Sequence, residues 1–168
     1  MKVYITLLVA LVPFFADAKW DCYEYAGKPN MAQLVVYRSR DDVTYRYMYN
    51  YRDSTFRIQM IPSAVVLAWL KNQLDRYPFR PAYVEVLFRF KGGPEGKRNL
   101  MLRIENPSPD SGEIVRKGYI ETVIRDKDGE LLYNLQHSKK MGIRYWDFLV
   151  GYHRTINLST KDFCKFCK

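Results

Sequence analysis

The sequence predicts an α+β fold in which one main helix packs on an antiparallel β-sheet. Residues 43–52, VTYRYMYNYR, alternate between two kinds of side chain with a period of two, which is typical of a strand. Residues 64–76 instead repeat their apolar positions at helical spacing. Strand-like runs stand both before and after this helix, and an order of strands, one helix and strands favours the α+β class.

Three strands are expected before the helix. Residues 32–38 form the first, and a turn at residues 40–42 leads into residues 43–52, followed by residues 55–61. In the second strand one face is expected to carry Val43, Tyr45, Tyr47, Tyr49 and Tyr51. The opposite face then carries Thr44, Arg46, Met48, Asn50 and Arg52.

The helix has start and stop signals of its own. Pro62-Ser63 suits a first turn, because proline is tolerated there and serine caps free N–H groups. Tyr77-Pro78 ends the segment, since a residue before proline avoids the α region. The apolar stripe consists of Val66, Leu70, Leu74 and Tyr77.

The second half of the chain is expected to be strands. Residues 82–90 and 99–106 flank a Gly/Pro loop and predict a hairpin. Residues 118–125 and 130–136 flank Asp-Lys-Asp-Gly, which predicts a second tight turn between strands. Residues 143–152 give the last long strand. The sequence contains no repeat or linker, so we expect one domain over residues 19–168.

Residues 1–18 have the layout of a secretory signal. Lys2 precedes an apolar run, and Ala16-Asp17-Ala18 resembles a cleavage site before Lys19. The apolar run is shorter than the roughly 20 residues that a membrane-spanning helix needs, and Pro13 interrupts it. We therefore expect a secreted protein that passes through an oxidising compartment and has no membrane anchor.

Three cysteines allow at most one intramolecular disulfide. Cys22 pairs with Cys164 or Cys167, or the two C-terminal cysteines pair with each other. We favour a bridge from Cys22 to Cys164, because Cys167 is one residue from the chain end and closing a loop of about 140 residues restricts the unfolded chain by about 5 kcal/mol. The spacing of the cysteines and the two histidines matches no zinc-finger pattern, so neither metal nor cofactor is predicted.

The formal net charge of +9 favours anionic partners. Arginine contacts phosphate and tyrosine stacks on bases, so interleaved Arg and Tyr residues are compatible with single-stranded RNA. The same residue types are enriched at protein interfaces, so a protein partner fits as well. The alternative is a pair of strands whose tyrosines face the core while its arginines are solvated. The candidate binding residues are Arg38, Arg40, Arg46, Arg52, Arg57, Tyr47 and Tyr49.

Trp20-Asp21-Cys22 resembles the Y/F/W-x-C motif of powdery mildew secreted effector candidates, many of which are RNase-like proteins associated with haustoria. Residues 61–78, IPSAVVLAWLKNQLDRYP, resemble the helix region of the same family. The resemblance implies an RNase T1/F1-like fold, a disulfide from the first cysteine to a C-terminal one, and a monomeric virulence effector that binds a host protein or RNA to suppress plant defence. It leaves open whether the protein enters the host cell. This chain departs from the pattern in its expanded strand region, residues 28–61, and its third cysteine.

Ribonuclease chemistry requires a base, an acid and a cation beside the phosphate. The candidates for such a site are Glu85, Arg103, His153 and Arg154, in which His153-Arg154 would mimic the acid and the phosphate ligand; the alternative is that His153 is a surface histidine on the last strand. The strands directly after the helix contain no histidine, and an arginine shares the strand face of both Glu85 and Glu105. We therefore expect a pseudoenzyme without catalytic residues. The alternatives are an active secreted ribonuclease and an extracellular binding protein unrelated to ribonucleases.

One motif concerns modification. Asn157-Leu158-Ser159 is an Asn-x-Ser sequon, which accepts a glycan when it lies on a surface during secretion. Asn157 is therefore a candidate glycosylation site.

Overall fold

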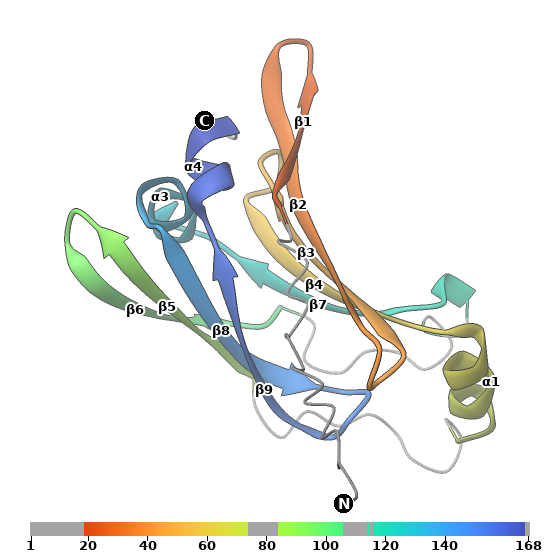
Figure 1. Ribbon diagram of the computed structural model, residues 1–168. Helices are drawn as coiled ribbons and strands as arrows, with labels where there is room; N and C mark the ends of the chain where they lie inside the picture. Colours follow the sequence, from red (N-terminus) through yellow and green to blue (C-terminus); the bar gives the residue numbers. More distant parts are fainter. Residues whose placement is uncertain (1–18, 74–83, 106–113, 115, 167–168) are drawn as a thin grey trace, which may run out of the picture.

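The computed structural model describes residues 19–73, 84–105, 114 and 116–166, of which residues 73 and 164–166 are described by their backbone alone. It contains two antiparallel sheets (Figure 1). The first has the strand order β1-β2-β3-β4-β7 and the second β6-β5-β8-β9. The first sheet consists of β1 (Asp21–Tyr25), β2 (Lys28–Arg38), β3 (Val43–Asn50), β4 (Thr55–Pro62) and β7 (Ile120–Arg125). The second consists of β5 (Glu85–Gly93), β6 (Gly96–Arg103), β8 (Lys140–Asp147) and β9 (Tyr152–Ser159). The described helices are α1 (Ala64–Gln73), α3 (Glu130–His137) and α4 (Lys161–Phe166).

The α+β class and the antiparallel pairing predicted from the sequence are confirmed. Strands β2, β3 and β4 follow the expected order, and β5 with β6 forms the expected hairpin. Within β3, the alternation places Val43, Tyr45, Tyr47 and Tyr49 in the core. Strand β1, which pairs with β2, was not anticipated from the sequence.

The expected strand at residues 130–136 is helix α3, so that prediction was wrong. Asp126 does not close a hairpin, because its two carboxylate oxygens accept the backbone N–H groups of Leu131 and Leu132 at 3.0 and 2.9 Å. Gly129 adopts a left-handed φ of 70° just before the helix begins. The Asp-Lys-Asp-Gly sequence therefore starts a helix by capping its free N–H groups.

The expected last strand, residues 143–152, is also wrong, because it spans the turn between β8 and β9. The Asp147 side chain accepts the N–H of Leu149, and Gly151 has a left-handed φ of 71°. This turn sends the chain back along β8, and β9 pairs with β8 from Tyr152 to Ser159.

Helix α1 begins where the sequence predicts, and the Ser63 hydroxyl accepts the N–H of Val66 at 3.3 Å as a cap. Its packing differs from the expectation. Val65 and Trp69 are 78% and 58% exposed, and the helix extends beyond the end of β4 instead of lying across a sheet (Figure 1). Among the described helices, α3 packs most deeply, since both Leu131 and Leu135 are fully buried. Packing of the predicted main helix on the sheet is therefore not confirmed.

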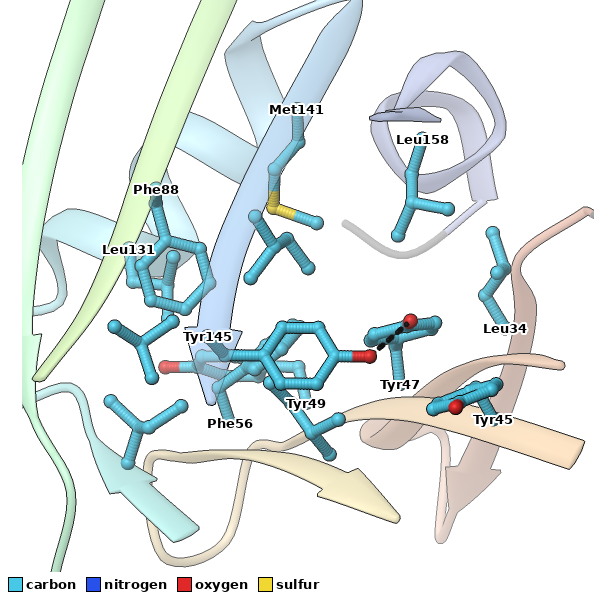
Figure 2. Close-up of a cluster of buried hydrophobic side chains, with 14 of the residues drawn as sticks. Leu34, Tyr45, Tyr47, Tyr49, Phe56, Phe88, Leu131, Met141, Tyr145 and Leu158 are labelled. Atoms are coloured by element: carbon cyan, nitrogen blue, oxygen red, sulfur yellow. Dashed lines mark hydrogen bonds between the residues drawn. The ribbon is translucent and has the colours of Figure 1, made fainter. Parts of the chain in front are cut away.

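One hydrophobic cluster draws side chains from both sheets, for example Phe56 and Phe88 with ring centroids 5.3 Å apart (Figure 2). Three tyrosines of β3 place their rings and hydroxyl groups inside this core. We call Tyr45, Tyr47 and Tyr49 the tyrosine ladder. Each hydroxyl meets a polar partner at 2.7 to 3.0 Å, and these partners are Asp147, Tyr145 and Asp126 respectively. Burial raises the pKa of each ladder hydroxyl above its ordinary value, so all three are neutral donors or acceptors.

The first and last parts of the described chain meet. Trp20 donates its indole N–H to the Ser159 carbonyl at 2.9 Å, and its ring packs edge-on against Phe163 at 5.1 Å. Cys22 lies beside this contact in the sequence and is disulfide-bonded. The side chains of Cys164 and Cys167 lie outside the described residues, so the choice of partner stays a prediction. At the other side of the fold, a bridge between Ile104 and Ile124 links the end of β6 to β7.

The expected signal segment, residues 1–18, lies outside the described residues. In the part of the chain that the structure covers, no helix has the length and hydropathy needed to cross a bilayer.

Loss of the Asp147 carboxylate should destabilise the fold strongly. Arg154 is 5% exposed and donates to Asp147 at 2.6 Å, and Tyr45 donates to the same oxygen. Asp147→Ala leaves a buried cation and a buried hydroxyl poorly paired, so we expect a loss of about 3–5 kcal/mol in the free energy of unfolding. Urea denaturation measures this loss, with Glu95→Ala at the exposed Arg98 pair as a control of about 0.5 kcal/mol. Equal losses in the two variants would contradict the role assigned to Asp147.

The disulfide prediction is tested by peptide mapping without reduction. We expect a peptide that joins Cys22 to a C-terminal cysteine, with Cys164 preferred. A Cys164–Cys167 link with a free Cys22 thiol would reject it.

Candidate nucleic-acid interface

The structure removes the two tyrosines from the predicted RNA-binding set. Tyr47 and Tyr49 are 0% and 1% exposed and belong to the hydrophobic core. A buried ring cannot stack on a base, so the assignment of these two residues to a binding surface was wrong. The alternative, with the tyrosine face of β3 in the core, is correct.

The five arginines of the predicted set do not share one surface. Arg46 and Arg57 lie on the outer face of the five-stranded sheet, where Arg57 pairs with Asp53 at 2.7 Å and with Glu121 at 3.6 Å. Arg46 bonds to the Gln59 side chain, and its Nε is buried. Ion pairs therefore occupy the Arg57 guanidinium, and the buried Nε of Arg46 is out of reach of a phosphate.

The other three arginines are dispersed. Arg40 lies in the turn after β2 and Arg52 in the turn after β3, so the length of β3 separates them. Arg38, at the end of β2, is half-buried and has the same strand parity as the buried Leu34. The Arg/Tyr strands therefore do not form the basic patch that the sequence predicts.

A basic surface lies instead on the outer face of the four-stranded sheet. Strands β5 and β8 pair in antiparallel register, so their outward side chains stand side by side. Four exposed cations belong to this face, and we call them the basic quartet: Arg89, Lys91, Lys140 and Arg144. With Gly142, Thr155 and Asn157 they line a groove of about 500 Å³.

The basic quartet has no acidic partner within the described part of the chain. The described ion pairs there belong to Arg57, Arg98, Arg125 and Arg154 instead. Lys91 and Lys140 stand directly opposite each other across the two strands, an arrangement of like charges that destabilises a sheet. An anion bound between them would offset this repulsion.

Gly142 forms the floor of the groove. A Cβ at this position would lie 3.0 Å from Asn157 Oδ1 and 3.7 Å from the Arg89 Cβ. Glycine weakens a strand interior and is used where another group approaches the backbone closely. The missing side chain lets the Asn157 amide lie against the backbone of β8 at the floor of the groove.

The structure separates His153 from Arg154, which the sequence analysis paired as acid and phosphate ligand. Neighbouring residues of a strand point to opposite faces, so His153 faces outward while Arg154 faces the core. The Arg154 guanidinium donates to Asp147 at 2.6 Å and to Asp41 at 2.8 Å. It is a buried structural cation, and its assignment as a phosphate ligand was wrong.

The other three candidates, Glu85, Arg103 and His153, do share the outer face of the four-stranded sheet. Glu85 stands directly opposite Arg103, and His153 stands opposite Trp146 with ring centroids 5.4 Å apart. Burial and the positive charge of Arg144 lower the pKa of His153 below its ordinary value of 6.5. The lowered pKa reduces the fraction of protonated imidazole that could act as a general acid at pH 7.

The remaining titratable candidates lie elsewhere. Glu105 is paired with Arg125, not with an arginine of its own strand. His137 stacks on Tyr133 within α3 at 4.2 Å. Among the described residues no three His, Cys, Asp or Glu side chains gather as metal ligands would.

No protein-family model, no curated protein and no solved structure matches this chain.

Proposed function

We propose that this protein is a secreted, non-catalytic effector that binds single-stranded RNA in the groove of the basic quartet. The observation that carries the proposal is the set of four exposed cations, none of them paired with a described acid, around a groove floored by glycine. Phosphates that displace counterions from such a surface supply most of the affinity for a nucleic acid.

Several features of this face favour a single strand over other polyanions. The Asn157 amide and Thr155 hydroxyl offer hydrogen bonds between the cations, and these groups suit base edges and 2′-hydroxyls. Trp146 and His153 provide aromatic side chains at one end of the same face. Combining a basic groove with aromatic side chains is how proteins hold single strands with little sequence preference.

The biological role follows from the resemblance to powdery mildew effectors. In this proposal the scaffold is RNase T1/F1-like and has lost catalysis, and it suppresses plant defence by sequestering RNA. Trp20-Asp21-Cys22, the strand-helix-strand order and the disulfide-bonded Cys22 support it.

An active ribonuclease is the second candidate, because Glu85, Arg103 and His153 share one sheet face. The lowered pKa of His153, which reduces its protonated fraction at pH 7, and the burial of Arg154 weigh against it. A base, an acid and a phosphorane-stabilising cation each contribute to the rate, so weakening the acid and burying Arg154 lower the expected activity.

RNA binding is tested by removing charge from the groove. Lys140→Gln with Arg144→Gln should weaken binding of a fluorescent single-stranded RNA 12-mer. The slope of log affinity against log salt should fall by about 1.4, since each lost phosphate contact accounts for about 0.7.

The matched control removes the same charge from exposed turns of the other sheet, through Arg40→Gln with Arg52→Gln. We expect its salt slope to stay close to that of the native protein. Equal effects of the two double variants would show that net charge alone attracts RNA. If the native protein binds a protein ligand but binds no RNA at low salt, the partner is a protein.

Incubation with single-stranded RNA at pH 7 should yield no cleavage product above background. Chromatography of the RNA after incubation measures this directly. Robust cleavage that disappears in His153→Ala would establish the ribonuclease alternative.

A further inference from the structure

The Asn-Leu-Ser sequon lies inside the proposed RNA groove. Asn157 is exposed on the outer face of β9, directly opposite Gly142, and its side chain lines the groove together with Arg89 and Arg144. A sequence motif for modification and a candidate ligand site therefore share one side chain.

Side chains alternate between the two faces of β9, so a glycan on Asn157 would point away from the core. Leu158, the middle residue of the sequon, is buried, whereas Asn157 and Ser159 both face solvent. Asn157 Oδ1 lies against Gly142, and the Asn157 side chain lines the groove. A group attached to its amide nitrogen would therefore stand at the groove beside the basic side chains.

We propose that N-glycosylation of Asn157 caps the groove, so that the glycan and RNA exclude each other. The inference rests on the proposed function and on the expected secretory signal at residues 1–18. In the modification, Nδ2 forms a bond to the anomeric carbon of an oligosaccharide donated by a lipid-linked pyrophosphate. The bond from that carbon to the phosphate oxygen breaks, the lipid pyrophosphate leaves with the electron pair, and the amide loses one proton.

The steric consequence follows from size. The groove has a volume of about 500 Å³, and the first sugars of a glycan would fill much of this space. They would stand between Arg89 and the β9 side of the groove, and an extended RNA strand could not contact both strands of the basic quartet. The glycosylated form is thus a secreted form with reduced affinity, and the form without the glycan binds RNA.

The experiment uses the full chain secreted from a glycosylating eukaryotic host. Wild-type protein is compared with Ser159→Ala, which removes the sequon but retains Asn157. Intact-mass measurement should detect a glycan on the wild type and none on the variant. The variant should bind the single-stranded RNA 12-mer about tenfold more tightly at low salt, because the phosphates regain their contacts with the cations.

A relocated glycan provides the control. In the Ser159→Ala background, Arg52→Asn creates an Asn-Asp-Ser sequence in the turn after β3, away from the groove. This variant, glycosylated at the new position, should bind RNA as its enzymatically deglycosylated form does. If the glycan at position 52 also lowers the affinity for RNA, any glycan has this effect, and the proposal that the Asn157 glycan blocks the groove is rejected.

Two further outcomes would also overturn the inference. The first is an unmodified Asn157 in the secreted wild type, and the second is equal RNA affinity of the glycosylated wild type and Ser159→Ala. If Ser159→Ala fails to bind RNA at low salt although the wild type carries the glycan, the proposed function has failed and the cap fails with it. The mass spectrum and the binding curve thus separate the two failures.

Discussion

The fold depends on hydroxyl groups that must find partners inside an apolar core. Tyr45 and Tyr47 reach across the core to Asp147 and Tyr145 of β8 in the other sheet, and Tyr49 bonds to Asp126, which follows β7. A buried polar group without a partner costs about 1–3 kcal/mol, so the contacts of Tyr45 and Tyr47 hold the two sheets in place against each other, and the contact of Tyr49 ties β3 to the start of α3.

The same contacts decide which side chains reach solvent. Because Tyr145 and Asp147 are held inward, strand parity forces Lys140 and Arg144 outward, next to the outward residues of β5. Asp147 also holds Arg154 in the core. The cationic face is thus the reverse side of the strand that anchors the ladder, and its position follows from the packing of the interior.

The sequence predicted what depends on local pattern and missed what depends on distant pairing. The alternation of residues 43–52 identified β3 and its buried face, because a period of two is visible in a single strand. The basic quartet was missed since it exists only when β5 pairs with β8, about 50 residues further along the chain. Arg57 was misassigned for the same reason, because one of its acidic partners, Glu121, comes from β7. Asp126 suggested a hairpin, and only its contact with Tyr49 and the N–H groups of α3 shows that it caps a helix.

The contact between Trp20 and Ser159 joins residues 139 positions apart. Interactions of such long sequence separation form late, since the entropy of closing the loop must be overcome before they contribute. The edge strand β1 therefore cannot reach its final environment while the chain is still being synthesised, and the last step of folding waits for the C-terminal segment.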